Sequence, residues 1–189
     1  MRDTGQVEEG WIEVRSGRKF YYDISPEEIA KVLTVEDIIW PASRICRYNG
    51  HSRKWYTTGE HEIHLCRKAR RDGHSPAIQK TFLLHDAAEG FVQDLARPFK
   101  MLIGGRYKEF EARIDEAVSI RFGTLYPFPA IIKEWDVRIC RDERYAIMRK
   151  SGNEWGVDHL KTLGIKPRGW SPWRVRWEMR REFRRLRVT

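Results

Sequence analysis

Residues 82–91 read Phe82-Leu-Leu-His-Asp-Ala-Ala-Glu-Gly-Phe91, an apolar run that ends in His85 and Asp86 with Glu89 about one helical turn further on. Helix positions three and four apart share a face, so we expect His85 and Glu89 on one side with Asp86 beside them. Neighbouring imidazole and carboxylate groups are suitable ligands for a divalent metal, and Glu89 is then a candidate acid or base next to it. Because a lone His-Asp pair is more often an ordinary surface or core pair, the metal hypothesis needs further ligands.

Candidate ligands occur on both sides of this stretch. Thr57 and Glu60 have the spacing of a helix N-cap with a capping box, which places His61 in the first turns of a helix. Asp136 is an acid of a predicted helix whose apolar residues could form an inward face, and a buried carboxylate needs a partner. With His85 and Asp86 they supply two imidazoles and two carboxylates, a mixed set that suits Mn, Co, Fe or Zn.

Each candidate also has a purely structural interpretation. His61 could be a helix residue that hydrogen-bonds locally, and Asp136 could be an ion-paired acid beside a neighbouring Lys or Arg. His64, three residues after His61, is interpreted as structural. The joint pattern, rather than any one residue, favours the metal hypothesis.

At these residues the chain resembles the HD-domain metal-dependent phosphohydrolases, and within them the small 5'-deoxynucleotidase-like group with bacterial and phage members. The resemblance extends from about Ser16 to about Met148. It rests on the ordered series of His, His-Asp and a late Asp, and on flanking segments. These segments are Ser16-Gly-Arg-Lys-Phe-Tyr-Tyr-Asp23, Ser43-Arg-Ile-Cys-Arg-Tyr-Asn-Gly-His51, Tyr56 to His61, Leu83 to Lys100, and Lys133-Glu-Trp-Asp-Val-Arg138.

The resemblance implies a role for each matching residue. The implied metal ligands are His61, His85, Asp86 and Asp136, for Co, Mn, Zn or Mg. The implied catalytic carboxylates are Glu89 and Asp94. The implied substrate contacts are Arg47, Tyr48 and Lys100, with Arg44 as an alternative match for Arg47.

Two departures from the family pattern concern the loop that carries Asp94. Gln93 stands where relatives often have Gly, and Ala96 stands where they often have Pro. We therefore expect a reshaped loop, which would alter the choice of substrate rather than metal binding. Asp94 itself could be a turn carboxylate, and Lys100 or Arg47 could be ordinary solvated cations.

Two classes of function follow. The first is an enzyme, a hydrolase in which metal-activated water attacks the phosphate of a deoxynucleotide, as a 5'-deoxyribonucleotidase or a dNTP phosphohydrolase, for example on dATP. The alternative is a non-catalytic basic module that binds nucleic acid and carries a degenerate metal site. The small-molecule nucleotide is the favoured partner, and the resemblance implies a homo-oligomer.

Composition is consistent with one cytoplasmic domain spanning residues 1–189. A chain of 189 residues can bury a single sizeable core. Its three cysteines are odd in number and widely spaced, which argues for a reducing compartment. No apolar segment follows Met1-Arg-Asp-Thr-Gly-Gln6 and no long apolar run occurs, so neither export nor a membrane is expected. The formal charge of +9 would attract anionic nucleotides.

The predicted fold class is all-α, an HD-type helical bundle with a small N-terminal β-hairpin. The hairpin is expected between Trp11 and Tyr22, with a turn at Ser16-Gly17, and Ser25-Pro-Glu-Glu28 predicts a helix start. Further helices are predicted near 35–48, 58–71, 76–91, 107–122 and 129–148, with Gly123 as a C-terminal stop.

The C-terminal part, residues 151–189, is interpreted as a surface extension that ends in a basic helix. Residues 151–172 are rich in Gly, Pro and Trp and predict irregular coil. Seven arginines follow between Arg174 and Arg187, around an apolar stripe at helical spacing. We favour an amphipathic helix packed on the domain over a nucleic-acid-binding tail, because arginine clusters alone are poor evidence of specific binding.

Overall fold

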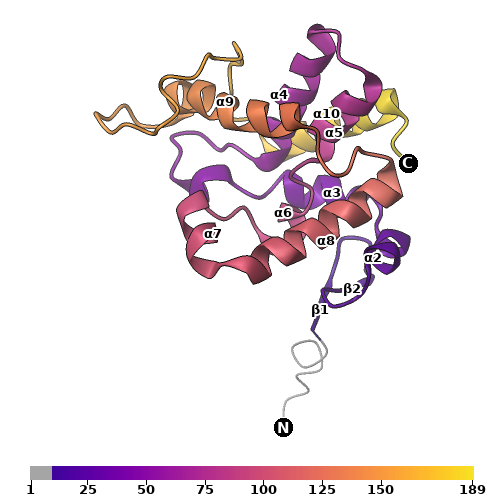
Figure 1. Ribbon diagram of the computed structural model, residues 1–189. Coiled ribbons are helices and arrows are strands. Elements are labelled where there is room, and N and C mark those ends of the chain that lie inside the picture. The colour runs from indigo at the N-terminus through magenta and orange to yellow at the C-terminus, as the bar shows by residue number, and fades with distance from the viewer. Residues whose placement is uncertain (1–9) are drawn as a thin grey trace.

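The computed structural model describes residues 10–189 and is mainly helical, with one two-stranded sheet at its N-terminal end (Figure 1). This confirms the predicted all-α class with a small hairpin. The expectation about Met1–Gln6 lies outside the described residues. In the described part of the chain, every helix is too short or too polar to cross a membrane.

The hairpin pairs β1 (Trp11–Glu13) with β2 (Lys19–Tyr21) in antiparallel register. Gly17 lies in the connecting turn at a φ of 78°, a conformation that glycine adopts without steric cost. Phe20 is fully buried and stacks on Phe91 with ring centroids 4.4 Å apart. The hairpin is thereby fixed to the helical body.

Helices α2 (Pro26–Val32) and α3 (Val35–Ala42) each begin with a complete capping box, at Ser25 and at Thr34. Helix α3 ends at Ala42, six residues before the predicted boundary. The chain then extends through Cys46, which pairs with Thr57 in an isolated β-bridge, and forms the short 3-10 helix η1 (Arg47–Gly50). This bridge takes the backbone out of the helical path.

Helix α4 (Thr58–Arg71) has the predicted bounds and the predicted Thr57 N-cap. The expected helix over 76–91 is instead divided into α5 (Pro76–Leu84) and α6 (Glu89–Val92). Between them, the amides of Ala87 and Glu89 donate to the carbonyls three residues earlier. A tight turn therefore sets the directions of His85 and Asp86. The expectation of one helix that presents His85 and Glu89 on the same face, with Asp86 beside them, was wrong.

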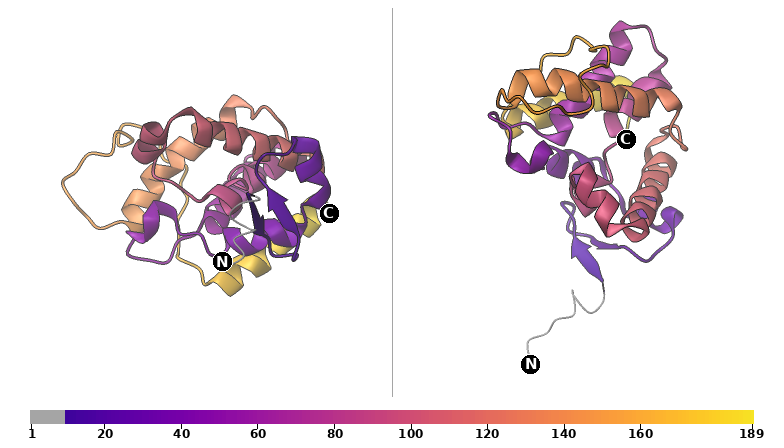
Figure 2. Two further views of the ribbon diagram at one scale, coloured as in Figure 1. Left: turned by 90° about the horizontal axis from the view of Figure 1, so that it is seen from below. Right: turned by 60° about the vertical axis from the view of Figure 1, so that its left-hand side comes forward.

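Three helices follow. They are α7 (Arg97–Ile103), which the sequence pattern did not predict, α8 (Gly105–Phe122) and α9 (Ala130–Ile147). Gly123 ends α8 in the left-handed conformation, as predicted. Helix α8 crosses the lower front of the molecule and α9 lies above it (Figure 1), a separation that is also visible from the side (Figure 2).

The C-terminal helix α10 (Pro172–Leu186) packs against α3, α4 and α5. The apolar stripe is buried, which confirms the packed amphipathic helix. Residues 151–171 contain no helix or strand, but Leu163, Ile165 and Trp170 join the main core. This coil is therefore more deeply embedded than the sequence suggested.

Candidate metal centre

The four predicted ligands meet at one point. His61 comes from the second turn of α4, His85 and Asp86 come from the turn after α5, and Asp136 comes from α9. One ligand atom from each lies within 4.8 Å of all the others, and residues 10–189 contain no second group of this kind. The two Nε2 atoms are 3.3 Å apart, and the Asp136 Oδ1 atom is 3.2 Å from the Nε2 atom of His61. We call these four residues the quartet.

Both imidazoles are held with Nε2 facing the quartet. The Nδ1 atom of His61 is 2.7 Å from the Oε1 atom of Glu143, and the Nδ1 atom of His85 is 3.0 Å from the carbonyl oxygen of Phe82. An acceptor at Nδ1 keeps the proton there and leaves the Nε2 lone pair free for a cation. This arrangement is the usual one for metal-binding histidines.

The charges of the quartet also fit a cation. Burial lowers the pKa of His85, but the neighbouring Asp86 and Asp136 carboxylates outweigh it and raise that pKa to about 10. Two carboxylates beside two buried imidazoles thus favour a positive charge, either a proton or a metal that displaces it. Two nitrogen and two oxygen donors suit Mn, Co or Zn, and the residues present therefore fit a divalent metal.

Glu143, which was not among the residues predicted from the sequence, holds the His61 ring in place through its Nδ1 atom. Its fully buried carboxylate accepts hydrogen bonds from the hydroxyls of Tyr48 and Tyr56 as well as bonding His61. Burial raises the pKa of Glu143, but Arg47 and His61 lower it to about 2, so the carboxylate stays ionised. Its position seven residues after Asp136, two turns along α9, was the signal that could have identified it.

Arg47 lies at the quartet, whereas the alternative Arg44 does not. The NH1 atom of Arg47 is 3.0 Å from the Oδ2 atom of Asp86, and its Nε atom is 3.7 Å from the Oε2 atom of Glu143. Arg44 is exposed and stacks over the ring of Trp40. Tyr48 points its hydroxyl at Glu143, so its polar end is occupied within the protein.

The predicted catalytic carboxylate Glu89 lies beside the quartet at the start of α6. It is 6% exposed, and its Oε2 atom has no hydrogen-bond partner among the described residues. Burial, with the nearby charges of Asp86 and Asp94, raises its pKa well above the usual range. A raised pKa favours the protonated carboxyl group, which can act as a general acid.

Lys100 and Asp94 lie near Glu89, on the same side of the quartet. The Nζ atom of Lys100 is 3.7 Å from the Oε1 atom of Glu89 and 2.7 Å from the Oε1 atom of Glu111, an acid that the sequence analysis did not identify. Burial raises the pKa of Asp94, while the charges of Arg47 and Lys100 oppose that rise. Both residues therefore lie within electrostatic reach of the quartet.

The loop before Asp94 is strained at Gln93. This residue has a φ of 75° and a ψ of 154°, a region that side chains other than glycine rarely adopt. Its carbonyl accepts a hydrogen bond from the Tyr107 hydroxyl at 2.7 Å, which helps to hold it there. The Gln93 departure noted in the sequence thus falls at a position where glycine would fit without strain.

His64 is outside the quartet, as expected. Its Nε2 atom is 3.2 Å from the Oε1 atom of Glu60, and its ring packs on Trp170. The predicted capping box at this helix is only half formed, because the Glu60 side chain accepts the amides of Arg168, Gly169 and Trp170 instead of the N-cap amide. Glu60 therefore fixes the C-terminal coil to α4.

Comparison with known proteins places the chain in a family. It is 30% identical to the uncharacterized protein YfdR of Escherichia coli over 152 residues, which cover 78% of each chain. It is 31% identical to the uncharacterized protein RCAP_rcc00048 of Rhodobacter capsulatus over 134 residues, which cover 67% of this chain and 65% of that protein. No protein-family model matches the sequence. The chain belongs to the YfdR family, and the names of these relatives state no activity.

Proposed function

We propose that this protein is a metal-dependent phosphohydrolase of deoxynucleotides, which removes the 5'-phosphate of a monophosphate or cleaves a dNTP. The observation that carries the proposal is the convergence of the quartet, with ligand atoms within 4.8 Å of one another. Glu89 and Lys100 beside it add a proton donor and a positive charge. We propose Mn, Co, Zn or Mg as the metal and the cytoplasm as the compartment, since the three cysteines are free thiols.

The proposed chemistry divides among named side chains. His61, His85, Asp86 and Asp136 would hold the metal, which when bound lowers the pKa of water and offsets phosphate charge. Glu89 gives a proton to the leaving oxygen, which its raised pKa favours. Lys100 contributes positive charge to the phosphate, and Asp94 contacts the sugar side.

In this proposal Arg47 exchanges a carboxylate partner for the phosphate of the substrate. In the structure its guanidinium bonds Asp86 and lies near Glu143. A guanidinium can release one carboxylate and take a phosphate in a bidentate contact. Arg47 therefore changes partners when substrate and metal enter, and it contributes to the electrostatic stabilisation that phosphoryl transfer requires.

The alternative of a nucleic-acid-binding tail has less support. Val175, Met179 and Phe183 of α10 are buried in the core, so the helix is fixed to the domain. Several of its arginines already have partners within the protein, including Arg180 with Glu36 and Arg185 with Glu182.

The test is a hydrolysis assay on a panel of deoxynucleoside mono- and triphosphates with Mn²⁺, Co²⁺, Zn²⁺ or Mg²⁺. We expect phosphate, pyrophosphate or triphosphate release that requires a metal and is lost in Asp86→Ala. Asp72→Ala, at the exposed C-terminal end of α4, is a matched control and should keep activity. Activity that survives in Asp86→Ala, or none in any metal, would overturn the proposal.

A further inference from the structure

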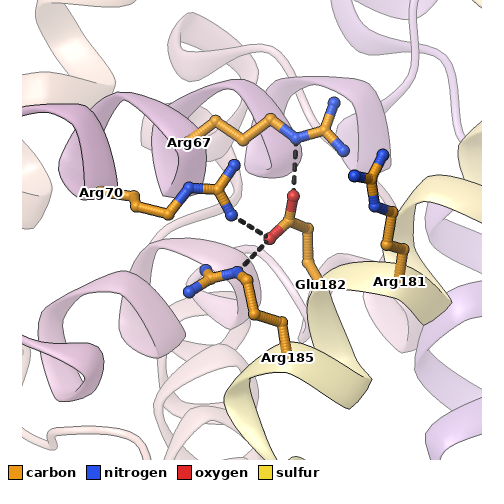
Figure 3. A pocket seen from close by; sticks show the side chains of 5 residues that line it. All are labelled: Arg67, Arg70, Arg181, Glu182 and Arg185. Carbon is orange, nitrogen blue, oxygen red and sulfur yellow. Dashed lines mark hydrogen bonds and ion pairs between the residues drawn. The ribbon is translucent and has the colours of Figure 1, made fainter.

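A second polar cluster lies between α4 and α10, and Figure 3 shows it from close by. Arg67 and Arg70 reach into it from α4, and Arg181 and Arg185 reach into it from α10 around Glu182. These five residues line a cavity of about 520 Å³ that we call the arginine pocket. None of them belongs to the quartet or contacts it in the structure.

The arginine pocket has an excess of positive charge. Glu182 is almost fully buried and accepts hydrogen bonds from Arg67, Arg70 and Arg185 at 2.7 to 2.9 Å. Arg67 also bonds Glu178, the second carboxylate at this place. Four guanidinium groups thus face two carboxylates, so two positive charges remain uncompensated.

Donors of these arginines also remain unused. Within residues 10–189, no carboxylate pairs with Arg181, whose guanidinium carbon lies 5.8 Å from the centre of the Trp177 ring. Arg70 bonds Glu182 through NH1 alone, which leaves its Nε and NH2 groups without an acceptor in the described chain. Guanidinium groups with free edges are the side chains best suited to bidentate phosphate contacts.

The positive surface continues into a second cavity. This cavity measures about 480 Å³ and shares Arg67 with the arginine pocket. Its basic lining also includes Lys68, Arg71, Lys166 and Arg168. Lys68 pairs with Asp72, but the side chains of the other three have no acidic partner in the part of the chain that the structure describes. A ligand that spans both cavities must therefore carry several negative charges.

We propose that the arginine pocket and the adjoining cavity form a binding site for a chain of phosphate groups. The charged lining of both cavities does not suit an apolar ligand, and a chain of phosphate groups would present several negative charges to the two cavities at once. The shared chemistry is a linear polyphosphate, either free or as the triphosphate of a nucleotide. This site is separate from the quartet and goes beyond the proposed hydrolase activity.

The test is calorimetric titration of the metal-free protein, kept in EDTA, with sodium tripolyphosphate, dATP and adenosine. We expect tripolyphosphate and dATP to bind, and adenosine to give no heat. Comparable affinities would assign recognition to the phosphate chain, while a tighter dATP complex would assign it to a nucleotide. Because binding rather than turnover is measured, the result does not depend on whether the quartet hydrolyses anything.

Two charge reversals on α10 make the test specific. Arg181→Glu should weaken tripolyphosphate binding by about tenfold or more, because it removes a charge-assisted contact and adds repulsion. Arg184→Glu makes the same change in net charge at an exposed residue that lines neither cavity, and it should weaken binding by less than about threefold. Circular dichroism and thermal melting establish that both variants fold.

If Arg181→Glu does not fold, Arg181→Gln and Arg71→Gln replace it, one for each cavity, with Arg184→Gln as control. Absence of tripolyphosphate binding would overturn the proposal. Equal weakening by the Arg181 and Arg184 variants would also overturn it, because that result indicates general attraction to a basic protein. Tight binding of single-stranded DNA with the same equal weakening would assign the surface to nucleic acid instead.

Discussion

Helix α4 contributes to two polar regions of opposite charge. In its second turn, His61 faces Asp86 and Asp136, where carboxylates outnumber the one nearby guanidinium of Arg47. Further along the same helix, Arg67 faces a region where guanidinium groups outnumber carboxylates. In the first region His61 and His85 are buried and Asp86 and Asp136 are partly exposed, whereas the second region opens to solvent between α4 and α10.

The difference shows how one helix can supply sites for ions of either sign. An excess of negative charge in a partly buried site is costly unless a cation neutralises it, as a metal held by the quartet would do. In the arginine pocket, gathering several positive charges is also unfavourable. Glu182 offsets part of this cost, and hydration offsets another part because the arginines are partly exposed. The quartet is therefore expected to depend strongly on its ion, whereas the arginine pocket is expected to remain folded without one.

The largest expected effect is the loss of activity when a residue of the quartet is changed. Asp136→Ala removes a proposed ligand, so we expect the proposed hydrolysis to fall by about 1,000-fold because the metal would no longer be held in place. Glu134→Ala, two residues earlier on α9 and 57% exposed at its side chain, is the matched control and should leave the rate unchanged. Steady-state assays with metal analysis measure both, and a fully active Asp136→Ala would contradict the role of Asp136.

A smaller loss should separate proton transfer from metal binding. Glu89→Gln keeps the shape of the side chain but cannot give or take the proton, so we expect kcat to fall by about 100-fold with unchanged metal content. Glu109→Gln, on the exposed face of α8, serves as control. If Glu89→Gln also loses the metal, Glu89 is a ligand rather than an acid or base.

The buried support of the quartet should affect metal affinity. Glu143→Ala removes the acceptor at the Nδ1 atom of His61, and we expect metal affinity to fall by about 10- to 100-fold. Glu143→Gln retains a carbonyl acceptor and should lose less. The ¹⁵N signals of the His61 ring report its tautomer directly. An unchanged tautomer and unchanged affinity in Glu143→Ala would show that Glu143 does not orient His61.

At the arginine pocket, we expect substitution of Glu182 to reduce stability in a pH-dependent way. Although burial raises the pKa of Glu182, hydrogen bonds from Arg185 and Arg67 lower it below its ordinary value of 4.5. A lowered native pKa means that the stabilisation is complete above that ordinary value and is lost as the pH falls through the native one. Glu182→Gln should therefore reduce the free energy of unfolding by about 1.5 kcal/mol at neutral pH.

That difference should shrink in acid, as urea unfolding at several pH values would measure. Glu109→Gln again provides the control and should show little difference from wild type at neutral pH. A Glu182→Gln difference that stays constant as the pH falls far below the ordinary value of 4.5 would contradict the charged network, because protonation of Glu182 removes its charge-assisted hydrogen bonds.

The smallest expected effect concerns backbone strain at Gln93, in the loop before Asp94. Gln93 has a positive φ that glycine tolerates, so Gln93→Gly should raise the free energy of unfolding by about 1 kcal/mol. Lys108→Gly, on the exposed face of α8, has the opposite expected sign because glycine weakens a helix interior by about 1 kcal/mol. A destabilised Gln93→Gly would mean that the Gln93 side chain makes a contribution larger than the strain.

Local signals in the sequence predicted much of the fold. Helix α4 has the bounds that Thr57 and the apolar pattern indicated, and the Ser25 capping box and the Gly123 stop are both present. These features depend on a few adjacent residues, so they can be recognised without tertiary information.

The features that could not be predicted from the sequence depend on contacts between distant segments. The apolar run through residue 91 continues past His85, so its pattern does not reveal the turn that separates α5 from α6. Helix α7 buries none of its residues and thus leaves no inward-facing pattern to detect. Glu143 is polar in a charged helix, and only the structure brings it to His61.

We propose that four side chains from three parts of the chain hold one divalent cation. Anomalous diffraction from crystals of the Mn²⁺- or Co²⁺-loaded protein tests it directly. We expect one strong peak about 2.0–2.3 Å from the nearest atoms of His61, His85, Asp86 and Asp136. A peak elsewhere, or a quartet that still bonds Arg47 with no peak at saturating metal, would contradict it.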